Sequence, residues 1–276
     1  MAAPWPRPDR PAVTSRLYAI RYGHLDRLSD HNFLGGDDHA QPMPLDYFVW
    51  VIRSDDHTIV VDTGFDAAAA ARRGRTLLRP VAQGLAAIGV DPGEVKDVVI
   101  THMHYDHAGN VPLFPKARFH VQDAEMAYCT GRAMGHRHLS APFDAQNVVE
   151  MVRRTFEGRV VFHAGDAVLG PGVSLHHLPG HTLGLQAVRV QTPRGPVVLA
   201  SDAIHFWANL TRATPFPIVA DVVAYLEALQ RLRTLATSID HIIPGHDPGV
   251  LARFPAEPGT RDIVRLDLAP SAQGEL

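Results

Sequence analysis

ITHMHYDHAGN, residues 100–110, places three histidines and one aspartate within the six positions from His102 to His107. The apolar run Val98-Val99-Ile100 stands directly before them and predicts a short buried strand. The chain contains 17 histidines, so a cluster of this kind can arise by chance and its spacing has to decide. The segment is either a polar loop in a histidine-rich protein or half of a metal site that residues elsewhere complete.

The spacing of these side chains favours a metal site. Alternate side chains of an extended segment point to the same side, so His102 and His104 are predicted to face one ion together. Asp106 and His107 are adjacent, and we expect them to start the next helix and face a second ion beside the first. Imidazole and carboxylate groups suit zinc, and also iron or manganese. Four ligands cannot complete two sites, so other segments have to supply more.

Three further segments share one pattern, an apolar strand followed by a turn and a ligand. They are HLPGHTLG with His181, VVLASDA with Asp202 and HIIPGHD with His246. The glycine before each of these two histidines permits a tight turn. VVDTGF has the same form, and its Asp62 is interpreted as a carboxylate that orients a ligand histidine. The simpler interpretations are turn histidines, a helix cap at Asp202, and a turn or cap at Asp62.

The ordered set of HxHxDH, a distant histidine, an aspartate and a last histidine resembles the metallo-β-lactamase superfamily, and the likeness runs from Asp62 to His246. The resemblance implies an α/β fold, an αββα sandwich in which two mixed β-sheets lie face to face with helices outside. The metal ligands that it implies are His102, His104 and His181 for one ion, Asp106, His107 and His246 for the other, and Asp202 as a bridge between them.

Strands and helices alternate along the chain, which predicts a layered fold with functional residues in loops at the strand ends. Strands are expected at 16–22, 47–53, 58–62, 98–101, 117–122, 160–163, 173–178, 185–191, 197–201 and 239–243. Helices are expected at 67–73, 77–88, 123–129 and 218–237, and residues 131–156 are predicted to be mainly a surface loop.

Composition narrows the class of protein. The length of 276 residues fits a single domain, placed at 16–276, after a flexible N-terminal arm at 1–15 with four prolines in its first eleven positions. A net charge of -3 without a long basic run does not favour nucleic acid as a partner. No apolar run approaches the roughly 18 residues that cross a bilayer, and no secretory signal is recognisable. Cys129 is the only cysteine, so no intrachain disulfide can form, and a cytoplasmic location is expected.

The predicted site indicates hydrolytic chemistry. Two divalent ions about 3.5–4 Å apart hold a water molecule between them and lower its pKa towards neutrality. The resulting hydroxide attacks a polarised carbonyl, and metal charge stabilises the tetrahedral alkoxide. Asp106 is expected to orient the hydroxide and to pass the proton to the leaving group. Esters, thioesters, lactones, lactams and phosphodiesters are all suitable substrates.

Several branches of the superfamily are less compatible with the sequence. Glyoxalase-II-type thioesterases carry a helical region after the last metal histidine, where this chain has only 30 residues (276 minus 246). Flavodiiron-type proteins need a flavin domain, true β-lactamases are exported and usually lack the bridging aspartate, and RNA-processing members need a nucleic-acid surface. The compact branch of lactonases remains, which includes N-acyl-homoserine lactone lactonases and 4-pyridoxolactonase. Length, Asp202 and the segment 44–66 fit that branch.

The leading prediction is therefore a dinuclear zinc lactonase, with iron, manganese or cobalt as other possible metals. One position departs from the quorum-quenching lactonases that the chain resembles, which have a tyrosine three residues after the bridging aspartate. His205 stands there, and because histidine can donate a hydrogen bond or act as an acid, it is a candidate catalytic residue. A loop or helix-start residue is the alternative. Phe206 and Trp207 are expected to form an apolar wall.

Other functions are compatible with the same motif. A thioesterase or cyclic amide hydrolase would use the same site, whereas a mononuclear iron protein would oxygenate sulfur compounds or sense redox state. A non-catalytic metal-binding protein is a further alternative. The loop at 31–48, with Phe33 and Met43, is expected to border the substrate pocket or a homodimer contact. The expected partner is a small molecule with a hydrolysable carbonyl, with no role for nucleic acid or a membrane.

Overall fold

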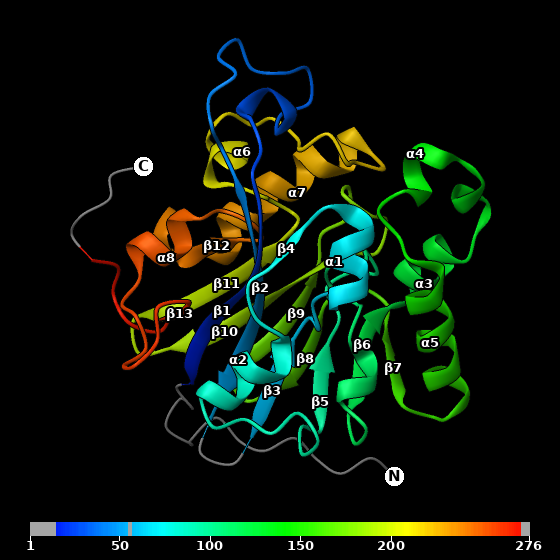
Figure 1. The fold of residues 1–276 in the computed structure, drawn as a ribbon, viewed down its shortest axis with the longest axis vertical. Coiled ribbons are helices and arrows are strands. Elements are labelled where there is room, and N and C mark those ends of the chain that lie inside the picture. Colours follow the sequence, from blue (N-terminus) through cyan, green and yellow to red (C-terminus); the bar gives the residue numbers. More distant parts are fainter. Residues whose placement is uncertain (1–14, 55–56, 272–276) are drawn as a thin grey trace.

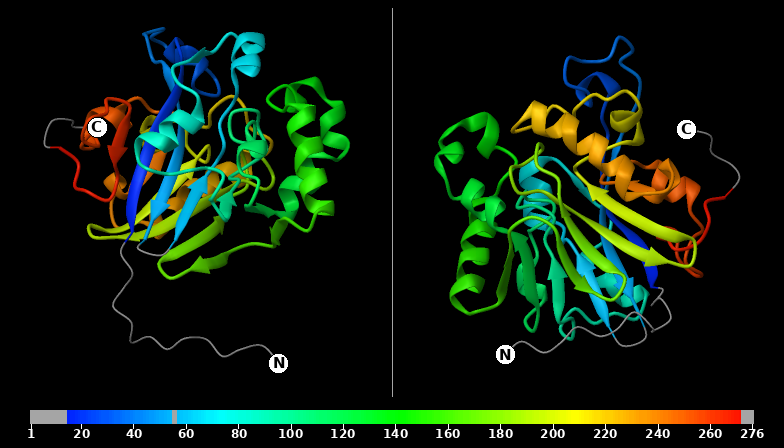
Figure 2. Two further views of the ribbon diagram at one scale, coloured as in Figure 1. Left: turned by 60° about the horizontal axis from the view of Figure 1, so that its bottom comes forward. Right: turned by 180° about the vertical axis from the view of Figure 1, so that it is seen from behind.

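The structure is a computed structural model that describes residues 15–54 and 57–271. The predicted arm at 1–15 lies outside the described residues except for Ser15, whose backbone N–H donates to the carbonyl of Gln191 at 3.1 Å. Two sheets lie face to face with helices on both outer surfaces (Figures 1 and 2). This arrangement confirms the predicted αββα sandwich. None of the helices described in the structure is both long and apolar enough to cross a membrane.

The larger sheet is mixed and has the order β13-β1-β2-β3-β5-β6-β7, with β4 paired to β1. Its strands are β1 (Arg16–Leu25), β2 (Leu45–Arg53), β3 (Thr58–Val61), β4 (Thr76–Leu77), β5 (Asp97–Val99), β6 (Arg118–Gln122), β7 (Val160–His163) and β13 (Ile263–Arg265). Strands β3, β5, β6 and β7 are parallel to one another, whereas β1 and β2 run antiparallel to their neighbours. The carboxyl ends of β3 and β5 therefore meet at one edge of the sheet.

The smaller sheet has the order β12-β11-β10-β9-β8. Its strands are β8 (Ala167–Gly170), β9 (Val173–His177), β10 (Gln186–Thr192), β11 (Gly195–Ser201) and β12 (Ile242–Pro244). Strands β8 to β11 are antiparallel, and β12 joins β11 in parallel. The parallel pair brings the carboxyl ends of β11 and β12 to the same edge.

The residues of β2 show why the larger sheet lies between two apolar layers. Side chains of a strand alternate between the two faces. In β2, Val49 and Val51 pack with the helices on the outer face, whereas Phe48, Trp50 and Ile52 pack against the second sheet. Both faces are apolar and both are buried, so the strand is almost continuously hydrophobic.

Helices form the two outer layers. They are α1 (Ala67–Arg73), α2 (Val81–Ala87), α3 (Asp123–Cys129), α4 (Arg137–Ser140), α5 (Ala145–Phe156), α6 (Trp207–Thr211), α7 (Val222–Leu235) and α8 (Gly249–Arg253), with short 3-10 turns at Ser29–His31, Val111–Leu113, Arg132–Gly135 and Ile239–His241. Helix α7 covers the smaller sheet through Tyr225, Leu229 and Leu232, and the right-hand view of Figure 2 shows this orange helix beside the yellow strands of that sheet.

Some predicted elements are wrong at their ends, and each has a local cause. The helix predicted at 77–88 begins only at Val81, because Leu77 belongs to β4 and pairs with Gly23. The helix predicted at 218–237 begins at Val222, where the Asp221 side chain accepts a hydrogen bond from the Ala224 N–H at 3.0 Å. The strand predicted at 239–243 is a 3-10 turn followed by β12.

The prediction of a loop at 131–156 is wrong over its second half. Residues 145–156 form α5, whose first turn is capped by the Asp144 carboxylate accepting from the Gln146 N–H at 3.0 Å. Only Val148 and Met151 of this helix are buried, but Val148, Met151 and Val152 recur at helical spacing, so the sequence contains a helical signal that the prediction missed. Strands β8 and β13 and the short helices α6 and α8 are also absent from the prediction.

Gly184 shows how closely the loop before β10 approaches helix α3 beside the strand ends. A Cβ at this position would overlap the backbone nitrogen and Cα of Glu125, at the start of α3. We expect Gly184→Ala to lower the free energy of unfolding by about 1–3 kcal/mol, because the backbones have to separate. Urea and thermal unfolding would measure this loss.

Gly170→Ala is the matched control, because no heavy atom lies within 4 Å of a Cβ built there. Its free energy of unfolding should stay within about 0.5 kcal/mol of the parent protein. Equal stability of the two variants would contradict the close approach at Gly184.

Candidate metal centre

The segment from His102 to His107 forms a tight turn after β5. The backbone N–H groups of His107 and Ala108 both donate to the His104 carbonyl at 3.1 Å, and the Tyr105 N–H donates to the Pro142 carbonyl at 3.0 Å. The expectation that Asp106 starts a helix is wrong, because the turn continues to a 3-10 segment that begins at Val111. The turn still directs all four polar side chains to the same region.

One group of ligand atoms gathers around His104. Its Nδ1 lies 3.0 Å from His102 Nε2 and 3.0 Å from His181 Nε2. Asp202 Oδ2 lies 3.3 Å from His181 Nε2 and 3.8 Å from His102 Nε2. Four ligands in a tetrahedron around zinc, with bonds of about 2.0–2.1 Å, would be separated by about 3.3 Å. The spacing of this group fits such an ion.

A second group lies beside the first. Asp106 Oδ2 is 3.7 Å from His107 Nε2 and 3.7 Å from His246 Nε2. Asp202 Oδ1 is 3.3 Å from His107 Nε2 and 3.0 Å from His246 Nε2. All of these side chains are buried.

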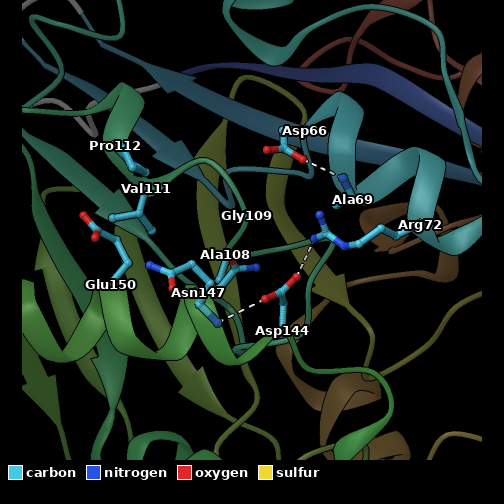
Figure 3. Close-up of a pocket in the computed structure, with 11 residues that line it drawn as sticks. Asp66, Ala69, Arg72, Ala108, Gly109, Val111, Pro112, Asp144, Asn147 and Glu150 are labelled. Atoms are coloured by element: carbon cyan, nitrogen blue, oxygen red, sulfur yellow. Dashed lines mark hydrogen bonds and ion pairs between the residues drawn. The ribbon is translucent and has the colours of Figure 1, made fainter.

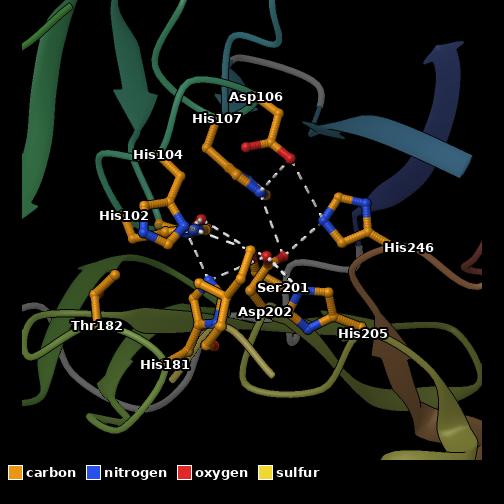
Figure 4. A network of polar contacts seen from close by, with 12 residues as sticks. His102, His104, Asp106, His107, His181, Thr182, Ser201, Asp202, His205 and His246 are labelled. Carbon is orange, nitrogen blue, oxygen red and sulfur yellow. Dashed lines mark hydrogen bonds and ion pairs between the residues drawn. The ribbon is translucent and has the colours of Figure 1, made fainter. Parts of the chain in front are cut away.

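Asp202 joins the two groups. Its Oδ2 faces the group around His104, and its Oδ1 faces His107 and His246 (Figure 4). The residue before it, Ser201, has a φ of 47°, in the left-handed region that a residue with a side chain seldom adopts. This bend at the end of β11 turns the carboxylate into the space between the two groups.

The histidine rings are held so that the nitrogen facing the cluster has a free lone pair. His181 Nδ1 lies 2.7 Å from the Ile218 carbonyl, and His246 Nδ1 lies 2.9 Å from the Asp46 carbonyl. A carbonyl oxygen only accepts, so Nδ1 carries a hydrogen in both rings, which leaves Nε2 as the nitrogen that can bind a metal ion. Metal-binding histidines are commonly oriented in this way.

Asp62 contacts a histidine of the cluster, as predicted. Its Oδ2 lies 2.7 Å from His107 Nδ1. Thr101 donates to the same carboxylate from its backbone nitrogen at 2.7 Å and from its hydroxyl at 2.8 Å. Burial raises the pKa of Asp62, and these hydrogen bonds oppose the shift. Asp62 has a φ of 63°, so the strained end of β3 is held by the same contacts.

The protonation of the first group of ligands suits a metal ion, whereas in the second group the nearby carboxylates, chiefly Asp202, outweigh burial and raise the pKa of His107 and His246. Burial, followed by repulsion from neighbouring imidazoles, lowers the pKa of His102 and His104 well below its ordinary value. Burial also lowers the pKa of His181 to about 3. These rings are neutral at pH 7, as metal ligands have to be. His107 Nε2 and Asp202 Oδ1 are buried without a hydrogen-bond partner, which is costly unless a cation completes the site.

Glu125 is a buried carboxylate that sequence reasoning missed. Its Oε1 accepts from the backbone N–H of Met103 at 2.7 Å, and its Oε2 accepts from the Thr182 hydroxyl and the Gly184 N–H at 2.6 and 3.1 Å. Met103 lies between His102 and His104, and Thr182 follows His181. Glu125 therefore ties together the two loops that carry the first group of ligands.

His205 lies within the cluster. Its Nε2 is 3.1 Å from Asp202 Oδ2, and its ring stacks on Phe216 with centroids 3.6 Å apart and an interplanar angle of 4°. Burial lowers the pKa of His205 to about 4, so the ring is neutral at pH 7. The apolar wall expected from Phe206 and Trp207 is wrong, because both side chains belong to the hydrophobic core.

A small cavity of about 50 Å³ opens onto the cluster and includes Asp106, His205 and His246 in its lining. No sequence pattern indicates the other polar residues that line it, which are Arg27, Tyr47, Arg75 and Tyr105. Leu45 and Tyr47 belong to the loop-and-strand segment expected to border the pocket. Phe33 and Met43 of the same segment do not line this cavity.

A larger hollow of about 480 Å³ lies between α1 and α5, away from the histidines (Figure 3). Its charged side chains already have partners: Arg72 pairs with Asp144 at 2.7 Å, Glu150 pairs with Arg154, and Asp66 accepts from the Ala69 N–H at the start of α1. No histidine or cysteine lines it. The chemistry of the molecule therefore belongs to the smaller cavity, where the ligand atoms converge.

We expect Glu125→Gln to weaken metal binding about 10–100-fold, because the amide places a donor against at least one of the three groups that now donate to the carboxylate. Competition with a chromophoric chelator would measure the metal affinity. Glu227→Gln is the control, since this carboxylate is exposed on α7. Equal metal affinity of the two variants would contradict the positioning role of Glu125.

Known proteins similar to this chain share its length and its fold. An N-acyl homoserine lactonase AttM from Azorhizobium caulinodans is 29% identical, over 90% of this chain and 98% of the relative. An N-acyl homoserine lactonase from a Bacillus species is 27% identical, over 85% of this chain and 94% of the relative.

The fold has solved counterparts. A quorum-quenching N-acyl homoserine lactone lactonase superposes with a TM-score of 0.71 at 23% identity, covering 86% of this chain and 94% of its own. The family model described as the metallo-beta-lactamase superfamily matches residues 43–246, which is more than half of the chain and contains every residue of the two ligand groups. The chain belongs to the metallo-β-lactamase superfamily.

Proposed function

We propose that the protein is a lactonase that holds two metal ions, zinc in the first instance. The observation that carries the proposal is the sharing of Asp202, whose two oxygens face separate groups of ligand atoms. A structural carboxylate would be satisfied by hydrogen bonds on both oxygens, whereas Oδ1 here is buried without one. Two zinc ions bound there would supply a water molecule of lowered pKa and a Lewis acid for a carbonyl.

The proposed ligands fall into the two groups that the distances between their atoms define. His102, His104 and His181 would hold one ion, Asp106, His107 and His246 the other, and Asp202 would bridge them. Zinc is favoured because imidazole and carboxylate ligands at this spacing suit a four-coordinate ion. A single iron ion would leave one of the two groups without a cation.

Asp106 is the proposed proton carrier. It lines the cavity together with four of the other six ligands, and at 8% exposure it is the most accessible of the seven. Its Oδ2 stands 3.7 Å from the Nε2 atoms of His107 and His246. A carboxylate at this place can orient a nucleophilic water and deliver its proton to the leaving alkoxide. In a lactone that alkoxide is part of the substrate, so it stays within reach of Asp106 when the ring opens.

His205 is proposed to contact the substrate carbonyl. It lines the cavity three residues after Asp202, and its lowered pKa keeps the ring neutral. Its Nε2 faces the Asp202 carboxylate at 3.1 Å, so the donor proposed for the substrate is Nδ1, which is buried without a hydrogen-bond partner. Stacking on Phe216 fixes the plane of the ring and therefore the direction of that bond.

A lactone is the carbonyl substrate that the relatives support best. The cavity of about 50 Å³ has room only for the reacting end of a substrate beside the ligands. The lactonase names of the relatives support the same substrate class, since they match this chain over nearly their whole length. A thioesterase or a cyclic amide hydrolase with the same residues remains the second candidate.

The direct test is a proton-release assay on zinc-loaded protein against acyl-homoserine lactones of several chain lengths, aromatic lactones, thioesters and β-lactams. Lactones should have the highest kcat/KM, and elemental analysis should find two zinc ions per chain. Preference for a thioester would move the proposal to the second candidate. One iron ion per chain and no hydrolysis would overturn it.

Asp106→Asn should lower kcat on the best lactone by about 10²–10⁴-fold, because the amide cannot carry the proton. Metal analysis of the same sample is needed, since Asp106 is also a proposed ligand. Full activity with both metal ions bound would contradict the proton-transfer role.

His205→Phe should lower kcat by about 10²–10³-fold with metal content retained, because the ring still stacks on Phe216 but donates no hydrogen bond. His163→Phe is the control, as His163 lies on β7 and does not line the cavity. A kcat equal to that of the control would exclude His205 from catalysis.

A further inference from the structure

Two arginines line the cavity above the cluster. Arg27 follows β1, and Arg75 lies between α1 and β4, so both come from segments that carry none of the proposed metal ligands. Neither forms an ion pair with a carboxylate in the part of the chain that the structure describes. Some other arginines are paired, for example Arg21 with Asp46 at 3.1 Å, whereas Arg189 and Arg233 donate to backbone carbonyls. Arg27 and Arg75 are distinguished by their place beside each other in the cavity that opens onto the cluster.

Hydrogen bonds hold the guanidinium of Arg75 in place. Its Nη1 donates to the Arg73 carbonyl at 2.7 Å, and its Nε donates to the Tyr105 hydroxyl at 3.0 Å. The Tyr105 hydroxyl in turn donates to the Tyr47 hydroxyl at 3.3 Å. All of these partners are neutral, and Nη2 has no partner among the described residues. The charge is therefore oriented but not compensated.

Arg27 is less exposed to water. Its Nη2 donates to the His31 carbonyl, but its Nε is buried without any hydrogen-bond partner. The guanidinium carbon lies 5.1 Å from the ring centre of Phe216, which stacks on His205. Burial lowers the pKa of Arg27, and the charge of Arg75 adds to this shift. A buried donor and an uncompensated charge are both costly, and a bound anion would relieve both.

The acids near the two arginines do not provide that compensation. The charge of Asp30 acts to raise the pKa of Arg27, and the charge of Asp106 acts to raise the pKa of Arg75. Neither carboxylate makes a hydrogen bond to its arginine. Asp106 is directed to His107 and His246. The donors of Arg27 and Arg75 that lack partners are therefore available to a ligand.

We propose that the cavity recognises a lactone that also bears a carboxylate on or beside its ring. Arg27 and Arg75 bind this carboxylate while the ring carbonyl lies over the metal ligands. This inference rests on the proposed lactonase function and names its substrate class. Guanidinium groups bind carboxylates with paired, charge-assisted hydrogen bonds.

The test compares two substrates that differ only in charge. One is γ-butyrolactone with a carboxylate on the carbon beside the ring oxygen, and the other is the matching primary amide. The zinc-loaded enzyme should have a kcat/KM at least about tenfold higher for the carboxylate. Arg27→Gln and Arg75→Gln should each reduce this preference about tenfold, through KM.

The controls separate charge from folding. Arg72→Gln should keep the preference of the parent enzyme, because Arg72 pairs with Asp144 outside the cavity. Arg27→Lys and Arg75→Lys should restore part of the preference, since they keep the charge but lose the paired geometry. Thermal unfolding of each variant would identify a loss that arises from misfolding.

Calorimetry gives a readout that does not depend on turnover. The carboxylate lactone should bind to the Asp106→Asn protein more tightly than the amide, and the arginine variants should remove this difference. Equal binding of the two compounds, or a preference unaffected by both arginine variants, would overturn the anion site. In that case efficient hydrolysis of both lactones would leave the proposed lactonase standing. Arginine-dependent binding without hydrolysis of any lactone would instead overturn the lactonase and support the anion site.

Discussion

The position of one carboxylate governs the site. Asp202 has to present its two oxygens to different groups of ligand atoms, at 3.3 Å from His181 and 3.0 Å from His246. The backbone around it is shaped for this purpose. Ser201 adopts a left-handed conformation, and a Cβ on Gly245 would lie only 2.5 Å from Asp202 Oδ1. The ends of β11 and β12 are therefore built around the carboxylate, and the remaining ligand loops are placed relative to it.

The sandwich provides that placement because ligands come from both sheets. The loop after β5 belongs to the larger sheet, whereas His181, Asp202 and His246 follow strands of the smaller one. Buried polar contacts lock the layers together just below the site. The Gln186 side chain on β10 donates to the carbonyls of Ile100 and His120, and Glu125 ties the loops on either side. A shift between the sheets would separate the two halves of the site.

The sequence predicts the metal ligands much better than the other residues that line the cavity. The cluster is recognisable because each candidate ligand follows an apolar strand, and strand ends on one edge must meet. The choice of ring nitrogen is not recognisable, since His104 presents Nδ1 whereas His181 presents Nε2, and this depends on what the other nitrogen contacts. A contact of this kind also explains why α7 begins at Val222 and not at the predicted residue 218. The Ile218 carbonyl holds His181, so the segment before Asp221 is not helical although its sequence is apolar.

The other residues that line the cavity have no sequence signal, because each of them comes from a different, unrelated segment. Arg27, Tyr47, Arg75 and Phe216 are spread over about two thirds of the chain and follow no common pattern. This separation has an evolutionary consequence. A substitution at one of these positions can alter the charge or shape presented to a substrate without disturbing any strand end that carries a ligand. The architecture therefore allows substrate preference to diverge among descendants of one ancestor while the reactive centre is inherited intact.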